Sequence, residues 1–580
     1  MKNIVFSLLV FFSLGMAAMA GGTISVADYG ARANDGSDTT PAVRQALEEC
    51  RKTGAAKLTF PPGRYDFWPD RAEEKFYFIT NNDSGLRAIE FPLTEVNGLE
   101  IDGGGAEFVF HDKIMPFVLD HSTNVTLRNF SIDWARTFHS EVKVLSVDDR
   151  GLEATIPEQF PYKIDKGSLV FLDEFKKPLP TRGILEFDPK KRETAFLVKD
   201  YFRDVCLRAH ADGPGRVHID EKIKATPGNV LVVTPDFRLY PAITVSDAAQ
   251  TQIIDVTIHH AGGMGVVAQR SRDITLERVR VTPPADGKRV CSLTADATHF
   301  SNCSGQIVMD HCLFENQMDD ATNIHGIYSR IDHRLGPDSV EVELVHPQQW
   351  GFDYLAAGER IEFVNAKSLV TYGEAMVKSA TRLNERFTNI VLDGTLPEKL
   401  QMGDVVALAG PYPDVRISHC DIGRNRARGL LLGSRGKIVI EDNVFHTAGA
   451  AILMEGNPSF WFEQAGVRDL TIRRNRFENC NYGTWGNAVI QVGAGIDPSQ
   501  RAVSRYNRNI LIEDNVFRVF DPRLINVYCV DGLTFTHNRV EHSTDYPAQY
   551  QDAKPFEISD CDHVRIDEAP GDAGAAGPGH

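Results

Sequence analysis

A short phrase that recurs along the chain constrains the fold more than any other feature of the sequence. The phrase runs from a polar residue through alternating apolar and polar residues to a polar pair, often containing Asn, and then another apolar residue. Clear copies begin at Asn124, Asp273, Asp414, Lys437, Asp469, Asn509, Gly532 and His563, and weaker copies begin at Gly98, Asp255 and Gln306. Repetition of this kind indicates units that bury their apolar faces only by stacking on one another.

The pattern within each copy predicts a strand, and the spacing predicts a coil. Alternation over four or five residues indicates a short strand with one buried face. We expect the Asn-containing break to bend the chain, because Asn tolerates a left-handed φ. The closest copies lie 23 residues apart, as from Asp414 to Lys437 and from Asn509 to Gly532, which is about one coil of a parallel β-helix. A β-propeller would need four strands per blade and a longer period. We therefore predict an all-β, right-handed parallel β-helix.

Two stretches, residues 136–245 and 328–410, lack the phrase but alternate like strands. Their apolar content is too high for long disordered loops, so we predict two small β-barrel-like domains inserted into turns of the coils. The remaining boundaries that we predict are a cap with the first coils at 21–135, further coils at 246–327, C-terminal coils at 411–568 and a flexible tail at 569–580.

The first residues predict an export signal. Lys2 supplies the positive charge, residues 4–14 are apolar, and Ala17, Ala18 and Ala20 are small residues before a cleavage site at Ala20 or Gly21. The apolar run is too short for a stable transmembrane span. We expect a signal peptide at 1–20 and an exported protein, periplasmic, on the outer surface or secreted, with no membrane span.

Charge and cysteine content exclude several functional classes. The formal net charge is −17, which disfavours binding to nucleic acid or anionic membranes and weakly disfavours a polyanionic substrate. The nine cysteines form no C-x-x-C pair, so neither a zinc site nor a redox site is expected. Most should be small buried residues. One bridge among Cys291, Cys303 and Cys312 stays open, as does the oligomeric state, with a homodimer as one option.

The beginning of the mature chain predicts a cap for the stack of coils. A helix should run from Pro41 to Cys50, with Pro41 in its first turn and Thr39 or Thr40 as the N-cap. Such a helix would cover the open end of the β-helix. The segments 26–31, 35–40 and 58–65 resemble the opening of the pectin-degrading β-helix superfamily, which implies a carbohydrate-active β-helix without identifying its chemistry.

Three aspartates stand out from the repeat. Asp296 and Asp319 are 23 residues apart, Asp320 follows directly, and the triplet Asp-Ala-Thr occurs at 296–298 and at 320–322. Coil spacing should therefore place them on adjacent coils, about 4.8 Å apart, where mutual repulsion raises at least one carboxyl pKa. Glycoside hydrolysis needs one protonated and one ionised carboxyl group. The cluster therefore predicts a hydrolytic site.

Two simpler interpretations compete with catalysis. β-Helices use aspartates freely at bends, and clustered carboxylates can bind calcium. Three aspartates at one-coil spacing, with His299 and His325 nearby, favour catalysis over turn residues. No glycine-spaced loop of calcium ligands accompanies them, so we predict no metal.

A closer resemblance rests on the chain opening, the segment Asp296-Ala-Thr-His299, the segment Asp319-Asp-Ala-Thr-Asn-Ile-His-Gly326 and the two insertions. Together, over about residues 22–568, these resemble glycoside hydrolase family 110. The resemblance implies an inverting exo-α-1,3-galactosidase that removes terminal galactose, including from blood-group B antigen, without a cofactor or metal. It also implies that Asp296, Asp319 and Asp320 are catalytic.

Analogy with polygalacturonases assigns Asp319 as the acid, with Asp296 and Asp320 holding the water. An inverting enzyme separates its acid and base carboxyl groups by roughly 6.5–9.5 Å, so we expect a diagonal arrangement of the two.

Sugar contacts are expected beside the aspartates and in irregular stretches between repeats. His325, Asn323 and His299 lie next to the aspartates in the sequence, and Trp485, Trp461, Tyr482 and Glu455 lie in the irregular stretches. Packing within loops explains any one of the latter four equally well. Arg424, Arg426 and Arg428 could bind hydroxyl groups, but salt bridging is the expected role of at least two.

Three functions remain open on the sequence. The leading hypothesis is hydrolysis of terminal α-1,3-linked galactose from an oligosaccharide or glycoconjugate, with linear and branched acceptors undecided. The second is a calcium-dependent polysaccharide lyase, or another β-helix glycoside hydrolase. The third is a non-catalytic glycan-binding β-helix, in which the aspartates would have no chemical role.

Overall fold

The computed structural model describes residues 21–202, 207–235 and 237–567. The predicted signal peptide, the tail from 569 and Cys206 lie outside these residues. Within these residues a single α-helix, α1, lies near the start of a long stack of strands, and four short 3-10 helices occur in turns. Their bounds are α1 (Thr40–Thr53), η1 (Val26–Tyr29), η2 (Pro69–Arg71), η3 (Pro347–Gln349) and η4 (Pro498–Val503).

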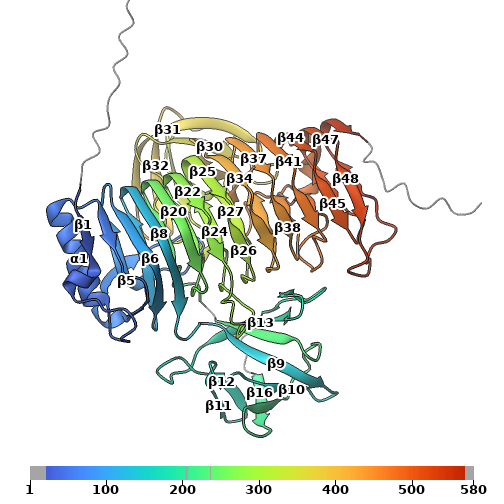
Figure 1. Ribbon diagram of the computed structural model, residues 1–580. Coiled ribbons are helices and arrows are strands. Elements are labelled where there is room, and N and C mark those ends of the chain that lie inside the picture. Colours follow the sequence, from blue (N-terminus) through green and yellow to red (C-terminus); the bar gives the residue numbers. More distant parts are fainter. Residues whose placement is uncertain (1–20, 203–206, 236, 568–580) are drawn as a thin grey trace, which may run out of the picture.

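Parallel strands from successive coils form two long sheets, which confirms the predicted β-helix (Figure 1). The larger sheet has 21 strands: β1 (Thr23–Ser25), β2 (Lys57–Thr59), β3 (Arg64–Phe67), β6 (Glu100–Phe110), β8 (Thr123–Trp134), β20 (Ala249–Ile258), β22 (Arg272–Glu277), β23 (Arg280–Val281), β25 (Ser304–Asp310), β26 (Leu313–Glu315), β34 (Asp414–Ser418), β35 (Asp421–Gly423), β37 (Lys437–Glu441), β38 (Val444–His446), β41 (Asp469–Arg473), β42 (Arg476–Glu478), β44 (Asn507–Glu513), β45 (Val516–Val519), β47 (Val530–Thr536), β48 (Arg539–His542) and β50 (Asp562–Ile566).

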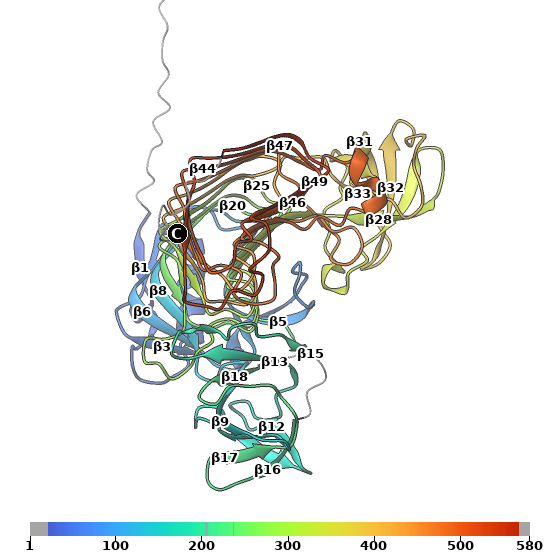
Figure 2. The same cartoon turned by 90° about the vertical axis from the view of Figure 1, so that its right-hand side faces the viewer.

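The second sheet has 13 strands, and the three predicted aspartates lie in turns just before two of them. They are β4 (Glu73–Tyr77), β5 (Gly85–Thr94), β7 (Ile114–Asp120), β19 (Ile243–Ser246), β21 (Val266–Gln269), β24 (Thr298–Ser301), β27 (Thr322–Ile327), β36 (Leu430–Leu432), β39 (Ile452–Met454), β40 (Glu463–Gln464), β43 (Ile490–Val492), β46 (Ile525–Tyr528) and β49 (Phe556–Ser559). Seen along the coil axis, the coils superimpose in projection and the inserted domains project to two sides (Figure 2).

Both insertions are β-rich, and the second of them closes into a barrel. The first is a ten-stranded sheet: β9 (Ser140–Val147), β10 (Leu152–Thr155), β11 (Tyr162–Asp165), β12 (Ser168–Phe171), β13 (Thr181–Asp188), β14 (Glu193–Thr194), β15 (Tyr201–Phe202), β16 (Leu207–Ala211), β17 (Arg216–Ile219) and β18 (Val230–Pro235). The second is a closed barrel: β28 (Ser329–Arg334), β29 (Ser339–Glu343), β30 (Arg360–Val364), β31 (Thr371–Arg382), β32 (Phe387–Asp393) and β33 (Val405–Leu408). Each insertion has its own apolar core, separate from that of the coils.

The repeat phrase sets the register of the coils. Val415 pairs with Ile438, and Ile510 with Leu533, so a coil of 23 residues is confirmed at both places. The apolar residue that ends the phrase points into the core, where Phe445, Phe477 and Phe517 stack at centroid distances of 5.1 and 4.7 Å. These distances match the spacing of neighbouring strands, so stacking and backbone pairing support each other.

The Asn of the phrase takes the expected left-handed φ in the copy at Asn124, where Asn129 has a φ of 59°. In the C-terminal copies the left-handed φ belongs instead to the residue before the Asn, with φ 59° at Asp442 and 53° at Arg474. There Asn475 is buried: its Oδ1 accepts from the Asn443 backbone N–H at 3.0 Å and its Nδ2 donates to the Ile440 carbonyl at 2.8 Å, both on the preceding coil, while its backbone N–H donates to Asn515 Oδ1 on the next coil at 2.9 Å. The ladder continues with the same contacts at Asn515 and Asn538.

The predicted capping helix is present, but its predicted cap contact is not. Thr39 occupies the N-cap position without a side-chain cap hydrogen bond, and Thr40 Oγ1 instead donates to Glu90 Oε2 at 2.8 Å. Helix α1 buries the side of Val43 and Leu47 against the first coil, at the blue end of Figure 1. It therefore covers the apolar end of the stack.

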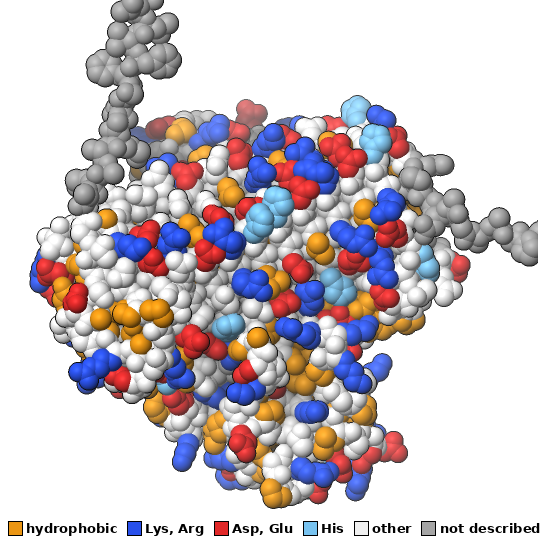
Figure 3. Space-filling model, viewed as in Figure 1, with side chains coloured by type: hydrophobic (Ala, Val, Ile, Leu, Met, Phe, Trp, Pro, Cys, Tyr) orange, Lys and Arg blue, Asp and Glu red, His pale blue; other side chains and the backbone are white. Residues whose placement is uncertain are grey.

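The described cysteines are all free, so the bridge left open among Cys291, Cys303 and Cys312 does not form in the described part of the chain. Seven of the eight are buried, as expected of small core residues. No helix of the described residues is long and apolar enough to cross a membrane. On the face drawn in Figure 3, acidic and basic side chains are interspersed over the coils, so the negative net charge does not gather there.

We predict that Asn475→Ala lowers the free energy of unfolding by about 2–4 kcal/mol, because it leaves the buried Asn443 N–H and Ile440 carbonyl of the preceding coil without partners. Urea denaturation followed by circular dichroism measures the change. Thr471→Ala, a part-exposed position in β41 of the same coil, is the control and should change stability by less than about 1 kcal/mol. Equal effects of the two substitutions would contradict a special role for the ladder.

Candidate active site

The three predicted aspartates meet at one end of the second sheet. Asp296 lies two residues before β24, and Asp319 and Asp320 lie just before β27, on the next coil. Thr298 pairs with Thr322, so the local register is 24 residues and Asp320, rather than Asp319, occupies the position equivalent to Asp296. Asp319 is the additional carboxylate, displaced by one residue along the turn.

The carboxylates are close together and shielded from solvent. Their relative exposures are 4% for Asp296, 8% for Asp319 and 3% for Asp320. One oxygen from each lies within 4.8 Å of one from each of the others. This spacing of oxygens confirms the predicted cluster and is tighter than the diagonal separation that we expected for an inverting pair.

Arginines from outside the two aspartate turns balance the negative charge. Asp319 accepts from Arg238 Nη2 at 2.6 Å and from Arg426 Nη1 at 2.7 Å. Arg428 donates to both oxygens of Asp320, Nε to Oδ1 at 2.9 Å and Nη2 to Oδ2 at 2.8 Å. The site thus holds three carboxylates and three guanidinium groups.

The contacts give each aspartate a different proton affinity. Burial, together with the charge of Asp319, raises the pKa of Asp296 to about 8. Burial also raises the pKa of Asp320, to about 6, although Arg428 opposes it. Burial would raise the pKa of Asp319 as well, but Arg426 and Arg238 outweigh burial and lower it. The trio behaves as a coupled set that holds about one proton near neutral pH.

The cavity in front of the trio has a volume of about 590 Å³ and is enclosed by several parts of the molecule. The coils supply Asn323, His299, Glu455 and Trp485, the first insertion supplies Arg182, and the segment following β29 supplies His346 and Gln348. Phe460 and Trp461 add an aromatic wall. A cavity of this kind, bounded on several sides and with polar groups converging on one point, suits one end of a ligand.

Apart from the arginines, five of the predicted sugar contacts line the cavity and two do not. Asn323, His299, Trp485, Trp461 and Glu455 line the cavity, and burial raises the pKa of Glu455 to about 7. His325 does not line it and lies behind His299. Tyr482 is fully buried, and its hydroxyl group contacts Thr194 Oγ1 at 3.2 Å.

The three clustered arginines all form ion pairs. Arg426 pairs with Asp200 and Asp319, Arg428 pairs with Asp320, and Arg424 pairs with Glu315 and Asp421. Two of them thereby orient the candidate catalytic carboxylates, whereas Arg424 is remote from them in the network.

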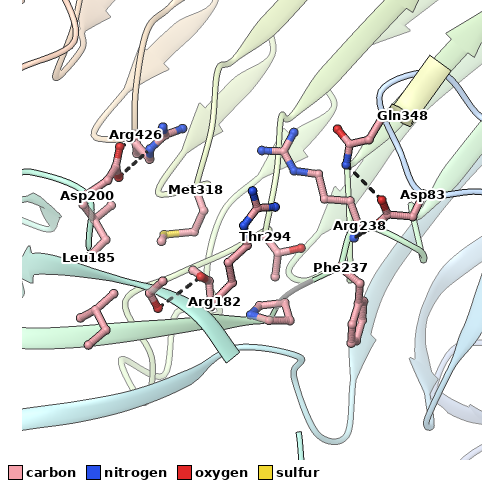
Figure 4. A pocket seen from close by; sticks show the side chains of 14 residues that line it. Asp83, Arg182, Leu185, Asp200, Phe237, Arg238, Thr294, Met318, Gln348 and Arg426 are labelled. Atoms are coloured by element: carbon pink, nitrogen blue, oxygen red, sulfur yellow. Dashed lines mark hydrogen bonds and ion pairs between the residues drawn. The ribbon is translucent and has the colours of Figure 1, made fainter. Parts of the chain in front are cut away.

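A side cavity adjoins the main one beneath the first insertion (Figure 4). Arg426 and Asp200 pair at one end, and at the other Gln348 Nε2 donates to Asp83 Oδ1 at 3.2 Å while Arg238 donates its backbone N–H to Asp83 Oδ2 at 2.9 Å. Arg238 and Arg426 line both cavities. Asp319, which they hold, therefore lies at the boundary between the two.

Several residues of the site had no signal in the sequence. Arg238, Arg182, Asp83 and Glu463 lie outside the repeat phrase and far from the aspartates in the chain. The boundaries of the insertions were the one available clue, because segments that leave and rejoin the coils near the trio must pass the cavity.

Family models match three segments of the chain, and two relatives match it over most of its length. Family models described as "GLAA-B beta-barrel domain I", "GLAA-B beta-barrel domain II" and "Right handed beta helix region" match residues 140–231, 339–406 and 409–567. "Alpha-1,3-galactosidase A" of Shewanella woodyi is 35% identical, over 92% of this chain and 88% of the relative. "Alpha-1,3-galactosidase B" of Bacteroides thetaiotaomicron is 33% identical, over 94% and 90%.

We predict opposite stability effects for two substitutions in the trio. The folded-state pKa of Asp296 lies above its unfolded value, so folding keeps a proton that the unfolded chain releases, and stability falls as pH rises from about 4 to about 8. Asp296→Asn removes this loss and should stabilise the fold by about 1–3 kcal/mol at pH 8. Asp319→Asn leaves Arg238 and Arg426 without their carboxylate and should destabilise it by about 3–5 kcal/mol.

Thermal unfolding of both variants at pH 5 and pH 8 tests this pair. The gain for Asp296→Asn should be larger at pH 8 than at pH 5. A loss of stability at pH 8 in Asp296→Asn would show that Asp296 is ionised and paired in the folded protein.

Proposed function

The chain belongs to the α-1,3-galactosidase family of glycoside hydrolases, and from this premise we propose that it removes single terminal α-1,3-linked galactose residues with inversion at the anomeric carbon. The observation that carries the proposal is the buried trio of aspartates that lines the cavity. Glycans such as blood-group B antigen and linear α-1,3-galactosides present the required chain end.

The shape of the cavity supports attack on a chain end. Walls from the coils, the first insertion and the segment after β29 bound the cavity beside the trio, an arrangement that favours the binding of one terminal sugar ring. Trp485 and Trp461 offer faces on which the apolar side of galactose can stack, and Asn323 and the arginines offer hydrogen bonds to its hydroxyl groups. An internal sugar of a polymer would need an open groove on both sides.

Cleavage requires a proton for the leaving oxygen and a carboxylate for the attacking water. We assign the water to Asp296 and Asp320, which occupy equivalent positions on successive coils and face the same part of the cavity. We assign the proton to Asp319, because Arg238 and Arg426, which hold it, also line the side cavity, into which we propose that the rest of the glycan extends.

The free site presents an obstacle to the second assignment, since Asp319 is ionised there between two arginines. Asp319 therefore needs to gain a proton when the substrate binds. Hydroxyl groups of the glycan that take over the hydrogen bonds of Arg238 and Arg426 would weaken both ion pairs and raise the pKa of Asp319.

The close spacing of the trio also suits a retaining mechanism, in which a carboxylate attacks the anomeric carbon. We favour inversion because both oxygens of Asp320 are held by Arg428 and one oxygen of Asp296 is bonded to His299, so neither carboxylate is free to turn toward the carbon. A calcium-dependent lyase fits less well, since guanidinium groups already balance the three carboxylates.

We predict that α-1,3-galactobiose and blood-group B trisaccharide both release galactose, with β-galactose appearing first in a proton NMR time course. Treatment with EDTA should leave the rate unchanged, and no ultraviolet-absorbing product should form. Initial α-galactose would overturn inversion, whereas loss of activity with EDTA or an unsaturated product would favour the lyase.

We predict that Asn at position 296, 319 or 320 lowers kcat for galactobiose at least about 10³-fold, while galactose binding is retained. A second substrate then distinguishes the roles of the three aspartates. Asp319→Asn should keep most of its activity on an aryl α-galactoside, because its phenol leaving group departs without a proton. Asp296→Asn and Asp320→Asn should lose activity on both substrates. If Asp296→Asn alone spares the aryl substrate, Asp296 is the acid and the two roles are exchanged.

A further inference from the structure

Behind Asp296, away from the arginines, two histidines form a chain of short contacts. His299 Nδ1 lies 2.8 Å from Asp296 Oδ2, and His299 Nε2 lies 2.8 Å from His325 Nε2. His325 Nδ1 lies 2.7 Å from the Gly326 carbonyl oxygen. Both rings are buried, with relative exposures of 1% and 4%.

Strand geometry explains why the two rings meet. In β24, His299 alternates with Thr298 and Phe300 and points away from the core of the coil. In β27 of the next coil, Asn323 pairs with His299, and His325 lies two residues further along on the same face. Alternation and coil stacking therefore bring His299 within reach of His325 on one side and of Asp296 on the other.

The contacts fix which nitrogens carry hydrogen when both rings are neutral. A carbonyl oxygen only accepts, so His325 Nδ1 is the protonated nitrogen and His325 Nε2 is bare. His299 must then donate from Nε2, which leaves its Nδ1 bare. The partner of this bare nitrogen, Asp296 Oδ2, must in turn carry a proton, because two acceptors do not form a hydrogen bond at 2.8 Å.

A second arrangement uses the same protons. If the Asp296 proton moves to His299 Nδ1 and the His299 Nε2 proton moves to His325 Nε2, every short contact is still a hydrogen bond. Asp296 is then a carboxylate and His325 an imidazolium. The two arrangements differ only in whether the chain is neutral or carries a negative charge at the cavity and a positive charge at its far end.

Glu463 lies beside the far end, where the second arrangement needs a negative charge. Its Oε1 is 3.7 Å from His325 Nε2 and accepts from Asn81 Nδ2 at 2.6 Å, and its Oε2 accepts from Asn323 Nδ2 at 3.3 Å. Two amide donors favour a carboxylate that stays ionised. Although burial acts to raise the pKa of Glu463, His325, His299 and these amides lower it.

We propose, building on the galactosidase function, that Asp296, His299 and His325 share one proton and that Glu463 is the fixed counter-charge that lets Asp296 ionise as positive charge develops on the sugar. His299 and His325 are then positioning residues for Asp296 rather than sugar-binding residues. In the free protein the proton rests on the Asp296 side, which agrees with the raised pKa of Asp296 and with the pKa of about 4 to which burial lowers His299.

The protons balance through one turnover. As the bond from the anomeric carbon to the leaving oxygen breaks, Asp319 gives its proton to that oxygen. The proton of Asp296 Oδ2 moves to His299 and that of His299 Nε2 moves to His325, so Asp296 becomes the carboxylate that removes a proton from the attacking water. Return of the chain proton from His325 and release of the water-derived proton to solvent restore the free site.

Other charged groups lie close enough to this hydrogen-bonded chain to shift the pKa values of its members. Those that face it are Asp319, Asp320, Arg238 and Arg428 from the cavity side and Glu463 from the far side. His346, which lines the cavity, also interacts with Glu463 and Arg238. Glu463 also lines the cavity and bonds to Asn323, so KM is measured together with kcat in its variant to separate substrate binding from the effect on the chain.

The kinetic test compares the pH dependence of kcat/KM for galactobiose in Glu463→Gln, His325→Gln and the matched control Ser301→Ala. Ser301 Oγ is 3.3 Å from His325 Nε2 but is not a member of the chain. In Glu463→Gln and His325→Gln we expect the alkaline limb, where the chain of Asp296, His299 and His325 loses its proton, to move down by about one pH unit. We expect kcat to fall about 10–100-fold with KM little changed. A purely structural role would lower the rate at every pH without moving the limb, and that result would overturn the proposal.

A second measurement does not depend on activity. With ¹⁵N-labelled histidine, the resonances lost in His299→Gln and in His325→Gln identify the two rings. We expect both rings to stay neutral from pH 5 to pH 8, His325 protonated at Nδ1 and His299 at Nε2. Ordinary titration of His325 near pH 6.5 would rule out the proposed hydrogen-bonded chain of Asp296, His299 and His325. Absence of galactose release by the wild type, with these tautomers observed, would instead reject the proposed function and leave the chain intact.

Discussion

The hydrogen-bond register between successive coils is the constraint on which the rest of the molecule depends. Parallel pairing places residues 23 or 24 positions apart in the sequence next to each other, so any side chain chosen for one coil is set directly against its equivalent on the next. The same register builds the phenylalanine stack in the core, the asparagine ladder at the bend and the crowded carboxylates at the turn. Structure and chemistry thus use one geometric rule.

The repulsion among the three crowded carboxyl groups has to be offset, and the fold does so in two different ways. Toward the cavity, Arg238, Arg426 and Arg428 hold Asp319 and Asp320 as carboxylates. On the side away from these arginines, Asp296 contacts His299, which contacts His325, and we propose that this neutral hydrogen-bonded chain keeps a proton on Asp296. One member of the trio therefore differs from the other two in charge, which is the condition that acid–base chemistry on a glycosidic bond requires.

The inserted domains make the site more than a property of the coils. A β-helix alone presents an open face, whereas Arg182 from the first insertion and His346 and Gln348 from the segment that follows β29 close the cavity around the trio. Asp200, also in the first insertion, pairs with Arg426, and through it the insertion reaches Asp319. Enclosure favours a chain end over the interior of a polymer and excludes water from the charged groups, which strengthens their interactions.

The sequence by itself determined the coil, its 23-residue repeat, the two β-rich insertions, the capping helix and the meeting of Asp296, Asp319 and Asp320, because all of these follow from periodicity along one chain. It did not determine that Asp442 and Arg474, rather than Asn443 and Asn475, take the left-handed φ, or that Asp320 is the equivalent of Asp296. Nor did it show that His325 lies behind His299, that Arg238 and Glu463 reach the site, or that Asp319 is paired with two arginines. Only the tertiary structure decided these, because they depend on how segments hundreds of residues apart pack around one turn, and periodicity carries no information about contacts outside the repeat.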